Sequence, residues 1–147
     1  MDDTVKILNE LIETSEDGLK GFSEAADRAT QPKLKQILSE RAQDCSQSVR
    51  ELQAMVLSLG GEPEKSGTFA GAAHRGWAKL KTAVGDSNIA LLEEVERGED
   101  HAKVHYAKAL KAQLPTQARQ LIEKQYQGLV ANHDRIRDLR NQYRAAA

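Results

Sequence analysis

The sequence predicts an all-α fold, a four-helix bundle of two antiparallel hairpins joined by a long crossover. Hydrophobic residues recur at spacings of three and four along four long stretches. Two of the three prolines stand at tight breaks between these stretches. Charged residues make up 29% of the chain and aromatic residues only 4%, whereas a β-sandwich of this size needs more aromatic and β-branched residues. The 147 residues suit a single domain that covers residues 1–147.

The first hairpin is predicted from helices over about residues 3–29 and 33–59. Gly18 and Gly21 lie inside the first helix, where we expect them to let a neighbouring helix approach closely. Pro32 fits the first turn of the second helix, because its missing N–H costs little there. The break between the two helices is short, so they should lie antiparallel.

The crossover begins at Gly60 and Gly61, which end the second helix because glycine readily takes the left-handed conformation. Residues 62–67 read as a loop. A shorter helix is predicted over about 68–84, and Trp77 lies on its apolar face. We expect Trp77 to anchor this helix against the bundle.

The second hairpin is predicted from helices over about residues 87–112 and 115–143. Pro115 stands at the tight break between them, where it can start a helix. One long connection between two short ones is the connectivity of ferritin-like bundles, whereas cytokine-like bundles need two long connections.

Charge and targeting signals exclude several classes of function. The net charge of −1 provides no strong field for nucleic acid or an anionic membrane, so neither is expected as a partner. No stretch approaches the roughly 18 apolar residues of a membrane span. Cys45 is the only cysteine, which rules out an internal disulfide. The acidic N-terminus does not resemble a secretory signal, and we expect a cytoplasmic protein.

A dinuclear iron centre needs a glutamate from each of two helices and a Glu-x-x-His motif from each of the other two. The second helix contains no histidine, and the residue three before His133 is Val130. The sequence therefore lacks the motif. An atypical site remains as an alternative, and its candidate ligands are Glu16, Glu96, Glu99 and His133.

The competing interpretation is a polar cluster inside the bundle. Four polar residues fall on otherwise apolar stripes, namely Arg41, Glu99, Gln125 and His133. Glu96 lies one turn from Glu99 on the same helix. A buried arginine needs a carboxylate partner, so we expect Arg41 to pair with Glu96 or Glu99. His133 lies toward a helix end, where it would be half exposed in the simplest case.

Other candidate constellations are weaker. His101 and His105 have the i, i+4 spacing of zinc ligands, but no catalytic glutamate stands between them, and a coincidence on a solvated face is expected. Cys45 falls on the inner face as a small apolar side chain, with Arg41 one turn away as the only support for a redox role. No phosphate-binding glycine loop and no nucleophile elbow occurs.

Five short stretches carry a family resemblance: residues 8–13, 59–63, 74–77, 96–100 and 133–137, which read LNELIE, LGGEP, HRGW, ERGED and HDRIR. They resemble a bacterial, mainly proteobacterial, family of uncharacterised four-helix-bundle proteins in the ferritin-like superfamily, a domain of unknown function. The resemblance implies the fold and no activity.

The function predicted from the sequence is therefore a non-enzymatic one. We expect a helical bundle that forms a homodimer or binds another protein, with no cofactor, and a role in stress follows only by analogy of fold. The arginine-rich end of the last helix (Arg135, Arg137, Arg140 and Arg144) reads as a solvated face that could form the dimer surface. The alternative is an atypical metal-binding or iron-dependent oxidoreductase protein.

Overall fold

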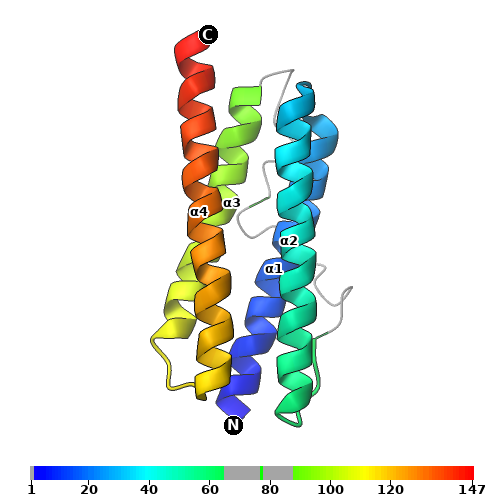
Figure 1. Ribbon diagram of the computed structural model, residues 1–147, viewed down its shortest axis with the longest axis vertical. Coiled ribbons are helices and arrows are strands. Elements are labelled where there is room, and N and C mark those ends of the chain that lie inside the picture. Colours follow the sequence, from blue (N-terminus) through cyan, green and yellow to red (C-terminus); the bar gives the residue numbers. More distant parts are fainter. Residues whose placement is uncertain (1, 65–76, 78–87) are drawn as a thin grey trace.

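The computed structural model describes residues 2–64, 77 and 88–147. This part of the chain forms four helices and no strand: α1 (Asp2–Arg28), α2 (Pro32–Ser58), α3 (Asn88–Leu110) and α4 (Thr116–Ala146). The helices pack side by side as a bundle with the two termini at opposite ends (Figure 1). The predicted all-α bundle is confirmed. The crossover helix predicted over 68–84 lies outside the described residues except for Trp77.

The turn between α1 and α2 is closed by a lysine from the second helix. Pro32 occupies the first turn of α2. Lys35 Nζ donates hydrogen bonds to the carbonyl oxygens of Ala26 at 2.9 Å and Asp27 at 3.2 Å. These carbonyls belong to the last turn of α1, where no intrahelical donor is available. A cation at a helix C-terminus also interacts favourably with the helix dipole.

The end of α2 follows the predicted glycine cap. Gly60 has φ +80°, in the left-handed region, and its N–H donates to the Leu57 carbonyl at 3.0 Å. The N–H of Gly61 donates to the Val56 carbonyl at 3.0 Å. This pair of bonds is the Schellman motif. The chain that follows is tied to α1, because the Asn9 carboxamide accepts from the N–H of Glu64 at 2.9 Å.

In the second hairpin, as in the first, a cationic side chain donates hydrogen bonds to carbonyl oxygens at the end of the preceding helix. The Arg119 guanidinium donates to the carbonyl oxygens of Leu110 at 2.8 Å and Ala112 at 2.6 Å. α4 begins directly after Pro115 and runs to Ala146, three residues beyond the predicted end at 143. None of the described helices is both long and apolar enough to cross a membrane.

The apolar core consists of two clusters along the bundle axis. The cluster at one end is built around Phe22, Leu38, Leu92 and Ile136. The cluster at the other end is built around Leu8, Ile12, Leu52 and Ile122. The residues between them in each helix include buried polar side chains such as Ser15, Glu99 and Gln125. The bundle therefore carries a polar layer at the middle of its core.

Trp77 lies wedged between α1 and α3. Its indole packs edge-on against Phe22, with ring centroids 5.2 Å apart. A Cβ added at Gly21 would lie 2.4 Å from the indole, and one added at Gly98 would lie 2.2 Å from it. Two glycines on different helices thus form the slot that holds the ring. The space expected at the two glycines of α1 is thus filled by Trp77 of the crossover at Gly21 and by Cys45 of α2 at Gly18.

Candidate functional site

The centre of the polar layer is an ion pair between α2 and α3. Arg41 Nε lies 3.5 Å from Glu99 Oε2, and the two side chains are 11% and 1% exposed. Asn132 of α4 donates to Glu99 Oε1 at 2.8 Å. The Arg41 guanidinium also lies over the Phe22 ring, 5.9 Å from its centroid. Of the two glutamates considered for Arg41, the structure pairs it with Glu99.

The ionisation of Glu99 is shifted by its surroundings. Burial raises the pKa of this carboxyl to about 7, although Arg41, Asn132 and His133 oppose the shift. Removal of water penalises the charged form of a carboxyl, whereas a nearby cation and a donated hydrogen bond favour it. This places the pKa of the Glu99 carboxyl near neutral pH in the folded chain.

Cys45 lies next to this ion pair and is buried. Burial raises the pKa of the thiol to about 11, and Arg41 offsets only part of this effect. The thiolate is the nucleophilic form of cysteine, and at pH 7 a thiol with this pKa is almost entirely protonated. The side chain packs as a small apolar group against Gly18, which argues against the redox interpretation.

A chain of hydrogen-bonded side chains close to the ion pair joins all four helices. The Tyr106 hydroxyl lies 3.1 Å from Ser15 Oγ and donates to Gln125 Oε1 at 2.8 Å. Gln125 Nε2 in turn donates to Glu51 Oε1 at 3.1 Å and to the Ser48 carbonyl at 3.3 Å. Burial raises the pKa of Tyr106 further above its ordinary value. By its spacing in the sequence, Tyr106 falls on the apolar stripe of its helix, and a buried phenol normally finds a hydrogen-bond partner.

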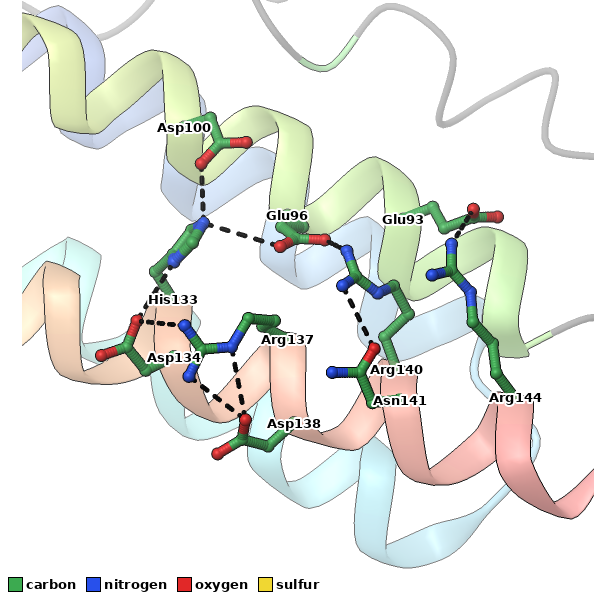
Figure 2. A network of polar contacts seen from close by, with 10 residues as sticks. All are labelled: Glu93, Glu96, Asp100, His133, Asp134, Arg137, Asp138, Arg140, Asn141 and Arg144. Carbon is green, nitrogen blue, oxygen red and sulfur yellow. Dashed lines mark hydrogen bonds and ion pairs between the residues drawn. The ribbon is translucent and has the colours of Figure 1, made fainter.

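The third polar group lies along the outer seam between α3 and α4, shown in Figure 2. His133 Nε2 is 2.6 Å from Asp100 Oδ1 and 3.7 Å from Glu96 Oε2. Glu96 also pairs with Arg140, and Glu93 pairs with Arg144 at 2.6 Å. His133 is buried, not half exposed.

The five residues predicted as one interior cluster take part in three sets of contacts. Arg41 and Glu99 form the central ion pair, Gln125 belongs to the tyrosine chain, and Glu96 and His133 face the α3/α4 seam. Side chains three positions apart on an α-helix point in directions that differ by about 60° around the helix axis. Glu96 and Glu99 are three positions apart, so they face different helices.

The histidine pair is more enclosed than expected. The rings of His101 and His105 lie with centroids 4.7 Å apart, and both residues are partly buried. These residues therefore lie at the edge of the buried face and not on a fully solvated one. His101 lines a cavity within the polar layer, and its Nε2 atom is buried.

A cavity of about 30 Å³ lies within the polar layer. Its lining includes residues from the ion pair, the tyrosine chain and the tryptophan wedge: Arg41, Cys45, Trp77, Glu99, His101 and Tyr106. A cavity needs about 10–15 Å³ by this measure to hold one water molecule. The space is therefore matched to about two waters and is too small for an organic ligand.

The residues do not fit a dinuclear metal centre. Within the described part of the chain, no three His, Cys, Asp or Glu side chains are grouped so that they could hold a metal ion. Glu16 is buried on α1, but Glu96 faces Arg140 and Glu99 faces Arg41. The charge of the deepest carboxylate is thus balanced by a guanidinium. The ligand set of Glu16, Glu96, Glu99 and His133 is not assembled.

The chain is similar to known proteins both in its sequence family and in its fold. The model of a domain of unknown function, DUF2383, matches residues 3–112. No curated protein matches the chain. A crystal structure from Anabaena variabilis, of a two-domain protein containing DJ-1/ThiJ/PfpI-like and ferritin-like domains, is similar with a TM-score of 0.80 and 12% identity. The similarity covers 99% of this chain and 38% of that one, and it confirms a ferritin-like fold.

Proposed function

The chain belongs to the DUF2383 family, and we propose that it is a non-enzymatic helical bundle that acts by self-association or by contact with another protein. The observation that carries this proposal is that the buried polar side chains of the polar layer bind one another within the bundle. Arg41, Glu99 and Asn132 contact one another across three helices. Tyr106 and Gln125 are likewise held by partners within the bundle.

Catalysis by such groups would require a nucleophile or base within reach of a substrate. The most deeply buried carboxylate, Glu99, faces a guanidinium instead. The single thiol has a raised pKa of about 11, so it is a poor nucleophile at neutral pH. The alternative of an atypical iron-dependent oxidoreductase is favoured by no observation in the described residues.

Among the residues that the structure describes, two large apolar side chains are exposed and available for contact. Val104 on α3 is 66% exposed and Leu57 at the end of α2 is 63% exposed. The arginine-rich end of α4 is a weaker candidate, because Arg140 and Arg144 are neutralised by glutamates of α3. A homodimer that buries Val104 would use the same patch on both copies, as two-fold interfaces do.

The test is the oligomeric state measured by sedimentation equilibrium from low micromolar to near-millimolar concentration. We expect a monomer–dimer equilibrium that Val104→Lys shifts to monomer, because a charge would be buried in the interface. Gln43→Lys, at an exposed polar position of α2, is the matched control and should leave the equilibrium unchanged.

A monomer over the whole range contradicts self-association. The remaining part of the proposal is then tested by quantitative capture of partners with the wild-type protein, Val104→Lys and Gln43→Lys as baits. Loss of a captured protein with Val104→Lys alone supports contact through α3. Equal capture by all three baits contradicts a role for that surface.

A further inference from the structure

A groove runs between the N-terminal half of α1 and the end of α3, which lie at the same end of the bundle (Figure 1). Its volume is about 380 Å³, and it shares no lining residue with the cavity in the polar layer. The floor is formed by apolar side chains from both sides: Ile7, Leu11, Ala109 and Ala112. The two alanines carry no side chain beyond Cβ, so they leave room that larger apolar residues would fill.

The two rims of the groove carry opposite charges. Glu10 on the α1 side and Lys108 on the α3 side both line the groove, and both are exposed. Within the described part of the chain, neither of these two side chains forms an ion pair. Each charge is therefore accessible to a partner of opposite sign. An apolar centre within a charged rim is also the usual anatomy of a protein–protein interface.

The outer surface of α3 supplies a side chain that fits such a groove. Val104 is 66% exposed and lies one helical turn before Lys108. A two-fold interface uses the same patch on both copies, so the patch must contain both a hollow and a projection. The groove and Val104 provide both. The net charge of −1 adds little repulsion between two copies.

We propose that this groove is the interface between two copies of the chain. Val104 of each copy enters the groove of the other, and Glu10 of each copy pairs with Lys108 of the other. The inference rests on the proposed self-association, and it specifies the surface and the orientation of the dimer. A two-fold axis that brings the acidic rim of one copy against the basic rim of the other satisfies both charges at once.

The pairing is tested by charge reversal, with the dimer dissociation constant measured by sedimentation equilibrium at low ionic strength. Glu10→Lys and Lys108→Glu alone should each weaken the homodimer by at least about tenfold, because two like-charged pairs then face each other in every dimer. An equimolar mixture of the two variants should form a mixed dimer with about the wild-type affinity. In the mixed dimer, each reversed side chain meets an unreversed charge or another reversed one of opposite sign.

The control must exclude attraction by net charge alone. Glu10→Lys changes the net charge from −1 to +1, and Lys108→Glu changes it from −1 to −3. Glu40→Lys and Lys33→Glu, both at exposed positions of α2, produce the same two net charges. Each of these control variants should keep the wild-type dissociation constant, and their mixture should show no preference for mixed dimers. Circular dichroism of each variant checks that the helices are retained.

The outcomes separate this inference from the proposed function. A wild-type protein that stays monomeric over the whole concentration range contradicts both. A wild-type dimer whose dissociation constant is unchanged by Glu10→Lys and by Lys108→Glu supports self-association and overturns the groove as its interface. An equal preference for mixed dimers in the control mixture also overturns it, because net charge then explains the association.

Discussion

Glu99 makes the stability of this bundle depend on pH in a direction that can be worked out. Its ordinary pKa is 4.5, and burial raises the pKa to about 7 in the folded chain. Between these values the folded state holds a proton that the unfolded state has lost. Stability must therefore fall as pH rises through this window, because the folded state binds more protons.

The magnitude follows from the same two values. Each pH unit across the window changes the free energy of unfolding by about 1.4 kcal/mol, so the full effect is on the order of 3 kcal/mol. The Glu99 side chain is 1% exposed, so solvent screening removes little of it. Glu99→Gln keeps the shape of the side chain but cannot ionise, so this contribution should vanish.

The assay is urea unfolding at a series of pH values from 4.5 to 8, followed by circular dichroism and by the fluorescence of Trp77, the only tryptophan. The free energy of unfolding at each pH comes from linear extrapolation to zero urea. We expect the difference between Glu99→Gln and the wild type to change by on the order of 3 kcal/mol across the window. Glu93→Gln, at a carboxyl on the same helix that is 43% exposed and pairs with Arg144, should follow the pH dependence of the wild type. A constant difference between Glu99→Gln and the wild type would refute the reasoning.

Three further predictions use matched positions. Gly98→Ala should destabilise the bundle by about 1–3 kcal/mol or more in thermal and urea unfolding, because the new Cβ meets the tryptophan ring. Gly128→Ala is the control, and because the space around Gly128 is open, this change should stabilise the bundle by up to about 1 kcal/mol. Cys45 should react with a thiol reagent at neutral pH only as fast as the chain unfolds, and reaction at the rate of a free thiol in the folded protein would contradict its burial. At pH 8, where the Glu99 carboxyl is mostly ionised, Arg41→Met should cost about 3–5 kcal/mol of unfolding free energy, because it leaves a buried carboxylate without its cation. Arg137→Met should cost less than about 1 kcal/mol, and equal costs would contradict a special role for the central ion pair.

The arrangement of helices was predictable because its signals are local. The spacing of apolar residues marks each helix, and Pro32 and the cap at Gly60 mark breaks whose geometry depends only on neighbouring backbone atoms. The order of short and long connections then restricts how four such helices can pack. None of these inferences requires knowing which side chains meet across the bundle.

The candidate site was only partly predictable. The sequence indicated that Arg41 needs a carboxylate, because an unpaired buried charge is too costly. It could not choose between Glu96 and Glu99, because both lie near the inner face of the same helix. The structure decides this by the rotation of α3, which turns Glu99 toward Arg41 and Glu96 toward Arg140.

The roles of Trp77 and Tyr106 were decided by tertiary structure alone. The sequence showed a tryptophan on an apolar face and a tyrosine on an apolar stripe, but not the glycine slot or the chain of hydrogen bonds that receives them. Sequence determined which faces are buried, since hydrophobic periodicity belongs to each helix by itself. The packing of four helices determined which buried groups meet, because distances across a bundle depend on register and rotation that no single helix specifies.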